Sequence, residues 1–140
     1  MFETVVVGAA DSDGATKAFR RALALTRSTG GTLHLVAAID GKEGSRPAPW
    51  LPEEFRYTAM GSSPTDWLLH NLEQEAVRAG VEVSKHPVLD DPAGAISRVA
   101  AEEGADLVVV GSGSRRHGTR SLAHVPKAVM DHVSCAVLVV

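Results

Sequence analysis

Two glycine-rich stretches follow hydrophobic runs and have the composition of anion-binding loops. The first, GAADSDG, spans residues 8–14, and the second, GSGSRRHG, spans residues 111–118. Glycine and serine let backbone N–H groups approach an anion, and a helix that starts directly afterwards adds the positive end of its dipole. The second stretch and the segment after it contain four cations and no acidic residue: Arg115, Arg116, Arg120 and Lys127. The same residue types also serve turn geometry and solvation alone, so both interpretations stay open.

The known signatures of phosphate and metal chemistry do not fit these loops. GAADSDG matches neither Gly-x-Gly-x-x-Gly nor the Walker pattern, and the chain has no Gly-x-Ser-x-Gly turn and no zinc-ligand spacing. No two of the six histidines are spaced i, i+4 on an expected helix. Asp90 and Asp91 are possible metal ligands, but Asp91 before Pro92 is more simply a helix cap. The residues therefore predict no catalytic residue, no enzyme activity and no metal site.

The bulk composition excludes several classes of protein. The chain has 140 residues, 44% of them hydrophobic and 22% charged, which is typical of a single globular domain and not of a disordered one. A formal charge of −3 gives no basic field for nucleic acid. No apolar run approaches the roughly 18 residues of a membrane span. The start of the chain has no leader pattern and the single cysteine, Cys135, fits a buried structural thiol in a reducing compartment, so we expect a cytoplasmic protein.

Five short β-branched runs alternate with segments of helical periodicity. The predicted strands span residues 4–8, 32–38, 81–88, 106–111 and 135–140. The predicted helices span residues 13–29, from Pro64 to Gly80, from Pro92 to Gly104, and from about Pro126 to about His132. Ser12 or Asp11 is available to cap the first helix, and Gly30 to end it.

This alternation predicts an α/β fold with a doubly wound parallel sheet and helices on both faces. Runs such as VVV do not alternate in polarity, so both faces of their strands should be covered. Residues 40–62 have no period and predict a long crossover loop. Its aromatic residues, Trp50, Phe55 and Tyr57, either cover a pocket or partner or fold back onto the domain.

The chain resembles the universal stress protein family, especially its small single-domain actinobacterial members. The resemblance is carried by VVVG near the N-terminus, by DDPAGAISRVAAEEGADLVVVGS, and by VPKAVMDHVSCAVLVV at the C-terminus. It covers essentially all of residues 1–140 as one domain. It implies an adenine nucleotide alpha hydrolase-like fold with five strands in the order 3-2-1-4-5. It also implies a homodimer formed through the last strand, Cys135 to Val140, whose edge would otherwise carry unpaired backbone groups.

Family members that bind ATP carry Gly-x-x-Gly, then eight to ten residues, then Gly-Ser or Gly-Thr, and an aspartate after the first strand. Laid on this sequence, the first glycine matches Gly111 and the second falls on Ser114, or on Gly113 with a gap. The Gly-Ser pair becomes Ala123-His124, and the aspartate position falls on Ala10, one residue before Asp11. The resemblance thus implies a candidate cleft formed by Ala10, Asp11, Ala38, Gly111, Ser112, Gly113, Ser114, Arg115, Arg116, Ala123, His124 and Val125.

These departures predict a degraded nucleotide site. His124 replaces a small hydroxyl with a bulky ring, and Ala123 adds a methyl group where phosphate should approach closely. We therefore expect a dimeric, non-catalytic stress-response module. Two alternatives stay open: a site that still binds an adenine nucleotide such as ATP, AMP or cAMP, with the arginines replacing backbone contacts, and a weak ATPase that uses Asp11 or Asp13 with Mg²⁺.

Overall fold

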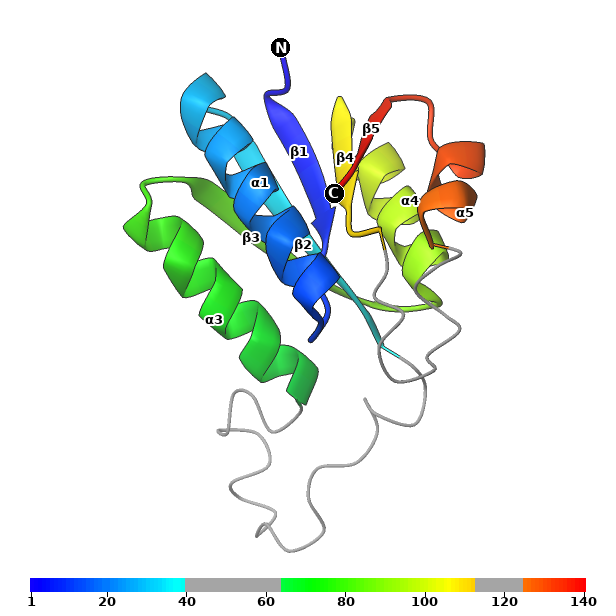
Figure 1. Ribbon diagram of the computed structural model, residues 1–140, viewed down its shortest axis with the longest axis horizontal. Coiled ribbons are helices and arrows are strands. Elements are labelled where there is room, and N and C mark those ends of the chain that lie inside the picture. Colours follow the sequence, from blue (N-terminus) through cyan, green and yellow to red (C-terminus); the bar gives the residue numbers. More distant parts are fainter. Residues whose placement is uncertain (40–63, 113–124) are drawn as a thin grey trace, which may run out of the picture.

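The five β-branched runs form one parallel sheet. The computed structural model describes residues 1–39, 64–112 and 125–140. Its elements are, in order, β1 (Thr4–Gly8), α1 (Asp13–Thr29), β2 (Thr32–Ile39), α3 (Pro64–Arg78), β3 (Glu82–Leu89), α4 (Pro92–Glu103), β4 (Leu107–Val110), α5 (Val125–His132) and β5 (Ala136–Val139). The strand order is β3-β2-β1-β4-β5 (Figure 1), so the predicted order 3-2-1-4-5 is confirmed.

The helices cover the sheet from both sides. Helices α1 and α3 lie on one face and α4 and α5 on the other (Figure 1). The α1 side is filled by Phe19 together with alternate valines and leucines of the strands, and the α4 side by Ile96, Val99 and the other set of alternate strand residues. Residues 5–7 of β1 are completely buried. The unbroken valine run is therefore explained by two covered faces, as predicted.

Local residues fix where the helices begin and end. Ser12 caps α1 by accepting a hydrogen bond from the N–H of Ala15 at 3.2 Å, which resolves the predicted choice between Ser12 and Asp11. Gly30 ends α1 and Gly104 ends α4, both in the left-handed region at φ 72° and 63°. Residues with a Cβ rarely adopt this conformation, so the predicted stops at these glycines are confirmed.

Two glycines allow close packing at the carboxyl end of the sheet. A Cβ on Gly111 would lie 2.6 Å from the carbonyl carbon of Gly14, so the end of β4 rests directly on the first turn of α1. A Cβ on Gly8 would lie 2.8 Å from the Cδ1 atom of Ile96, so the end of β1 is in close contact with α4. These contacts bring both helix starts next to the strand ends.

The predicted boundaries differ from the observed ones by one or two residues. Strand β2 extends to Ile39, β3 begins at Glu82, and α5 begins at Val125 rather than at Pro126. The predicted loop at 40–62, with its aromatic residues, lies outside the described residues. Within the described ranges, every helix is too short or too polar to cross a bilayer.

Candidate functional site

A cavity of about 120 Å³ lies at the carboxyl ends of β1 and β4. These strands are neighbours, but the helices that follow them in the chain, α1 and α5, cover opposite faces of the sheet. Such a switch point leaves a crevice between the two connections, which is where doubly wound proteins bind ligands. The cavity therefore lies where the topology predicts a binding site.

Small and apolar residues line this cavity. It is bounded by the end of β1, the start of α1, the inner part of β2, the start of α4, the end of β4 and the first residue of α5. Its described lining residues are Gly8, Ala9, Ala10, Ser12, Gly14, Ala15, Val36, Ala38, Pro92, Ile96, Val110, Gly111 and Val125. The side chains offer shape and apolar contact, because only Ser12 among these residues carries a polar side-chain atom.

The start of α1 faces the cavity and contributes its dipole. Ser12 and Gly14 both line the cavity. The Ser12 side chain is used as the helix cap, and its carbonyl accepts the Thr16 hydroxyl at 2.9 Å. An anion at this helix end would meet the positive end of the dipole.

The start of α4 has a different electrostatic character. Asp91 caps the helix by accepting the N–H of Gly94, and Asp90 Oδ1 accepts the N–H of Asp91 at 2.7 Å. The hydrogen bonds of the Asp90 carboxyl with the side chain of Asp91 and with its backbone N–H lower the pKa of Asp90. These two carboxylates are thus occupied at the helix start, and the predicted cap at Asp91 is confirmed.

A second cavity of about 520 Å³ adjoins the first between β1, β2 and α3. The two cavities share Ala9, Ala10 and Ala38. The described lining of the second cavity also includes Asp11, Thr65, Trp67 and Asn71, so it is the more polar part. Trp67 is 56% exposed. Together the two cavities form one cleft with an apolar inner part and a polar outer part.

The structure brings several of the predicted cleft residues together. Ala10, Ala38, Gly111 and Val125 line the inner cavity, and Asp11 lines the outer one. Ser112 is exposed, and its N–H donates to the carbonyl of Val140 at 2.8 Å. The remaining predicted residues lie outside the described part of the chain: Gly113, Ser114, Arg115, Arg116, Ala123 and His124.

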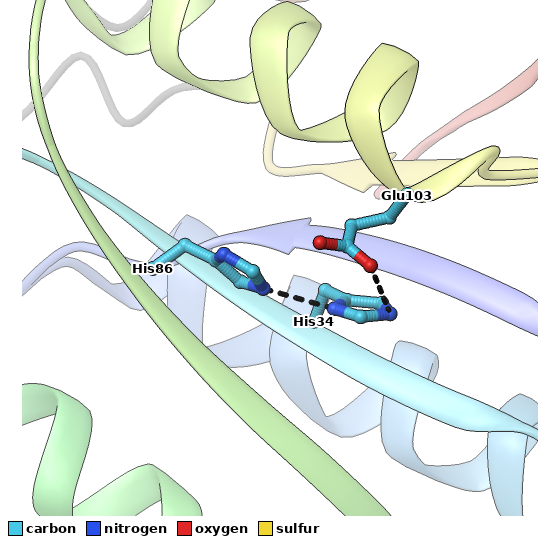
Figure 2. A group of neighbouring side chains, drawn as sticks. All are labelled: His34, His86 and Glu103. Atoms are coloured by element: carbon cyan, nitrogen blue, oxygen red, sulfur yellow. Dashed lines mark hydrogen bonds and ion pairs between the residues drawn. The ribbon is translucent and has the colours of Figure 1, made fainter.

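A polar cluster that the sequence analysis missed lies on the α4 face of the sheet. His34 of β2 and His86 of β3 face one another, with 2.9 Å between His34 Nδ1 and His86 Nε2, and Glu103 of α4 lies above them (Figure 2). His34 Nε2 is 4.0 Å from Glu103 Oε2. Residues 34 and 86 are far apart in sequence, so only the strand register could have revealed this pair: Val36, two residues after His34, is aligned with His86.

The electrostatic surroundings of His34 favour its neutral form. Burial is the main effect and lowers the pKa of His34, because the imidazolium would lose its hydration. Glu103 acts in the opposite direction, His86 lowers the pKa further, and Glu82 raises it. The pKa of His34 is therefore set mainly by burial, with Glu103 as the main opposing influence.

Cys135 and His132 lie at the two ends of the turn between α5 and β5. Cys135 is only half-buried, whereas a buried thiol was predicted, because β5 lies at the edge of the sheet. Burial still raises the pKa of the Cys135 thiol. His132 Nδ1 donates to the carbonyl of Ala128 at 2.7 Å, so its side chain satisfies a carbonyl in the last turn of α5.

Comparison with known proteins identifies relatives along the whole chain. The family model of the universal stress protein family matches residues 1–140. The universal stress protein Rv1636 of Mycobacterium tuberculosis is 33% identical over 141 residues, which cover 99% of this chain and 96% of that protein.

Solved structures show the same fold. A universal stress protein crystallised in complex with cAMP is 29% identical, with a TM-score of 0.72 over 99% of this chain and 96% of the other. The hypothetical protein MJ0577 is 22% identical with a TM-score of 0.77, over 100% of this chain and 96% of the other. The architecture is accordingly the predicted adenine nucleotide alpha hydrolase-like fold. This chain belongs to the universal stress protein family.

Proposed function

We propose that this protein is a cytoplasmic, non-catalytic stress-response module that binds an adenosine monophosphate, cAMP or AMP, in the cleft at the switch point. The inner cavity between β1 and β4 is the observation that carries the proposal. A relative that is 29% identical over 99% of this chain was crystallised with cAMP, which supports the choice of ligand.

The inner cavity has the chemistry of a site for a purine or ribose. Val36, Ile96 and Val110 supply apolar walls, and glycine and alanine residues leave space beside the strand ends. An aromatic base gains free energy by leaving water for such a surface. The outer cavity offers Thr65 and Asn71, whose side chains suit the hydroxyl groups of a sugar.

A single phosphate suits this cleft better than a triphosphate with Mg²⁺. Ala10 stands where the family resemblance implies an aspartate, and no carboxylate is among the described residues of the inner cavity. Asp11, one residue later, lines only the outer cavity. The Ala123-His124 pair replaces the family's Gly-Ser pair. One phosphate at the start of α1 would still gain from the helix dipole without needing these elements.

Calorimetric titration of nucleotide-free protein with cAMP, AMP and Mg²⁺-ATP tests the ligand. We expect cAMP or AMP to bind at least roughly tenfold more tightly than ATP, a difference of about 1.4 kcal/mol. Ala38→Leu, which adds bulk where both cavities meet, should weaken the binding of the monophosphate by a similar factor. Ala24→Leu is the matched control, because Ala24 is exposed on α1. Equal or tighter binding of ATP, or no nucleotide binding, would contradict the proposal.

The absence of catalysis is tested separately. Ser12, the only polar side chain in the described lining of the inner cavity, is already used as a helix cap. We therefore expect no release of phosphate from ATP by the purified protein. Release that disappears in Asp11→Asn would instead support the weak ATPase.

We further propose that the functional unit is a homodimer formed through β5. This strand ends the sheet next to β4 and carries four uncharged residues, Ala136–Val139. Pairing of two such edges would satisfy the backbone groups that a single chain leaves to solvent.

A further inference from the structure

The cluster on the α4 face contains a hydrogen-bonded histidine pair, His34 and His86, and a third side chain, Glu103, that lies close to this pair. One ligating atom from each of His34, His86 and Glu103 lies within 4.8 Å of those of the other two. The two imidazoles share a hydrogen bond of 2.9 Å, but the carboxylate is 4.0 Å from His34, beyond hydrogen-bond distance. The carboxylate is thus directed at the histidine pair without a hydrogen bond to either ring among the described contacts.

The three side chains are held by three different elements. His34 and His86 lie on adjacent strands of the sheet, and Glu103 is the last residue of α4, directly before the capping Gly104. The His34 side chain is only 8% exposed, whereas that of Glu103 is 38% exposed. The histidines are therefore positioned by the rigid sheet, and the carboxylate is at the side open to solvent, where an ion can enter.

We propose that His34, His86 and Glu103 form a binding site for a divalent metal ion of the zinc class. Two neutral imidazoles and one carboxylate are a ligand set that zinc accepts, with water in the fourth position. In a tetrahedral site with Zn–N bonds of about 2.0–2.1 Å, two nitrogens lie roughly 3.3 Å apart. His34 Nδ1 and His86 Nε2 are 2.9 Å apart, so the rings must separate by a few tenths of an ångström and turn toward a common point for the ion to replace the shared proton. The Glu103 carboxylate, which now lies 4.0 Å from His34 Nε2, must turn toward the same point.

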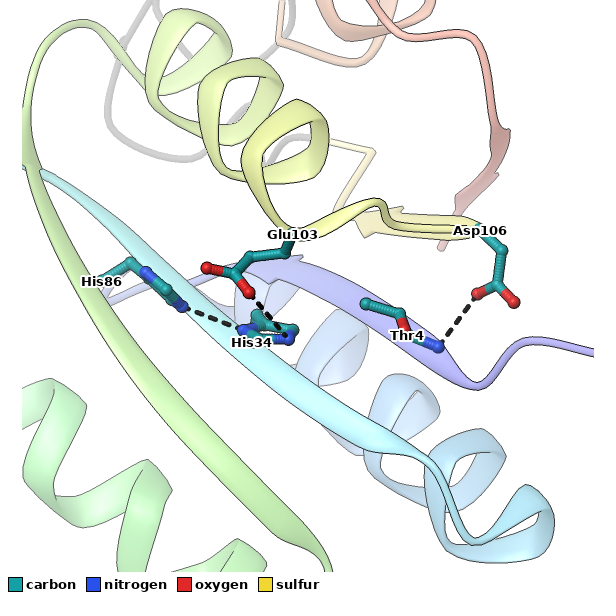
Figure 3. A network of polar contacts seen from close by, with 5 residues as sticks. All are labelled: Thr4, His34, His86, Glu103 and Asp106. Atoms are coloured by element: carbon teal, nitrogen blue, oxygen red, sulfur yellow. Dashed lines mark hydrogen bonds and ion pairs between the residues drawn. The ribbon is translucent and has the colours of Figure 1, made fainter.

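The nearby carboxylate of Asp106 is not part of this site. It accepts the backbone N–H groups of Glu3 and Thr4 at 3.0 and 3.1 Å. Figure 3 shows it turned toward the start of β1, away from the histidines. Of the two carboxylates labelled in Figure 3, Glu103 is therefore the one that completes the proposed ligand set with His34 and His86.

Titration of tag-free protein with ZnCl₂ tests the proposal. The protein is first treated with a chelator and exchanged into metal-free buffer, and every variant carries Cys135→Ser so that the thiol cannot bind the ion. We expect one equivalent of Zn²⁺ per chain. His86→Gln and Glu103→Gln should each weaken its binding by at least roughly 100-fold, since even the loss of an outer-shell partner typically costs 10–100-fold.

His70→Gln is the matched control. His70 lies on α3 beside Trp67, outside the cluster, so this variant should bind Zn²⁺ like the parent protein. Co²⁺ provides an independent readout, because a four-coordinate site gives intense visible absorption that the two cluster variants should lose.

Two results would overturn the proposal: Zn²⁺ binding by the parent protein no tighter than by His86→Gln and Glu103→Gln, or an equal loss of affinity in His70→Gln. Thermal unfolding without metal checks that each variant is folded. If His86→Gln fails to fold, Glu103→Gln decides the question alone, because its side chain is partly exposed and lies at the end of a helix.

Discussion

The two edges of the sheet, β3 and β5, differ in how their outer backbone groups are protected. Strand β3 has eight residues and includes Glu82, Lys85 and Pro87. Lys85 also forms an ion pair with Glu73 of α3 at 3.4 Å. Strand β5 has four residues, Ala-Val-Leu-Val, with no charge and no proline. Charged residues and proline on an edge strand oppose pairing with another chain, and β5 has neither.

The position of Pro87 makes the difference clearer. The carbonyl of Val36 accepts a hydrogen bond from Ala9, beyond the end of β1, so the backbone of the next residue, Ala37, faces β3. Pro87 is the register partner of Ala37, and its own backbone therefore faces the open edge. Proline lacks an N–H, so β3 offers one donor fewer to an approaching strand. The molecule thus has one edge that resists pairing and one that invites it, which is the physical basis for expecting a dimer through β5.

The largest expected effect comes from placing a charge on β5. Val139→Lys gives this edge the same kind of protection that Lys85 gives β3. We expect the dimer, about twice 14.7 kDa, to become a monomer, because two like charges would meet across the paired edges. Light scattering coupled to size-exclusion chromatography measures the mass.

Val77→Lys is the control for this charge. Val77 is 56% exposed on α3 and Val139 is 42% exposed, so both substitutions place a lysine on the surface. A dimer that survives Val139→Lys, or one that is lost equally in Val77→Lys, would show that β5 is not the interface.

A smaller effect should follow from removing the protection of β3. Pro87→Val restores an outward N–H and adds a residue with high strand propensity. We expect the weight-average mass to rise above that of the dimer as concentration increases, because both edges can then pair. Sedimentation velocity over a range of concentrations detects this, and a mass that stays constant would mean that Pro87 does not limit association.

The smallest effect concerns the thiol just before β5. Burial raises the pKa of Cys135, so at a given pH a smaller share of this thiol is thiolate than of a free cysteine. The rate of alkylation by iodoacetamide at pH 8 should be below that of glutathione, a free thiol with an ordinary pKa of about 8.5, and should keep rising at higher pH. A rate equal to that of glutathione would show that the edge leaves this thiol unprotected.

Local sequence signals predicted most of the fold. The caps at Ser12 and Asp91 and the stops at Gly30 and Gly104 depend on residues next to the helix ends, and they placed α1 and α4 within a residue. The uninterrupted valine runs predicted strands covered on both faces. The strand order came from the family resemblance, since local patterns do not specify which strands are neighbours.

The sites were harder to predict because they depend on contacts between distant parts of the chain. Ala10, Ala38 and Gly111 carry no chemistry of their own and form a cavity only where three strands end together. His34 and His86 are 52 residues apart, and no local pattern connects them. Their proximity follows from the register of β2 and β3, which aligns Val36 with His86 and places both histidines on one face.

The last residue is built into the sheet at the same end as the cleft. The N–H of Val140 donates to Val110 and its carbonyl accepts Ser112, both at the carboxyl end of β4. Met1 is 91% exposed and precedes β1, at the opposite end of a parallel sheet. A fluorescent protein or surface linker joined after Val140 would therefore emerge beside the cleft at the switch point and the β5 edge. The same fusion joined before Met1 would leave the cleft and the β5 edge accessible.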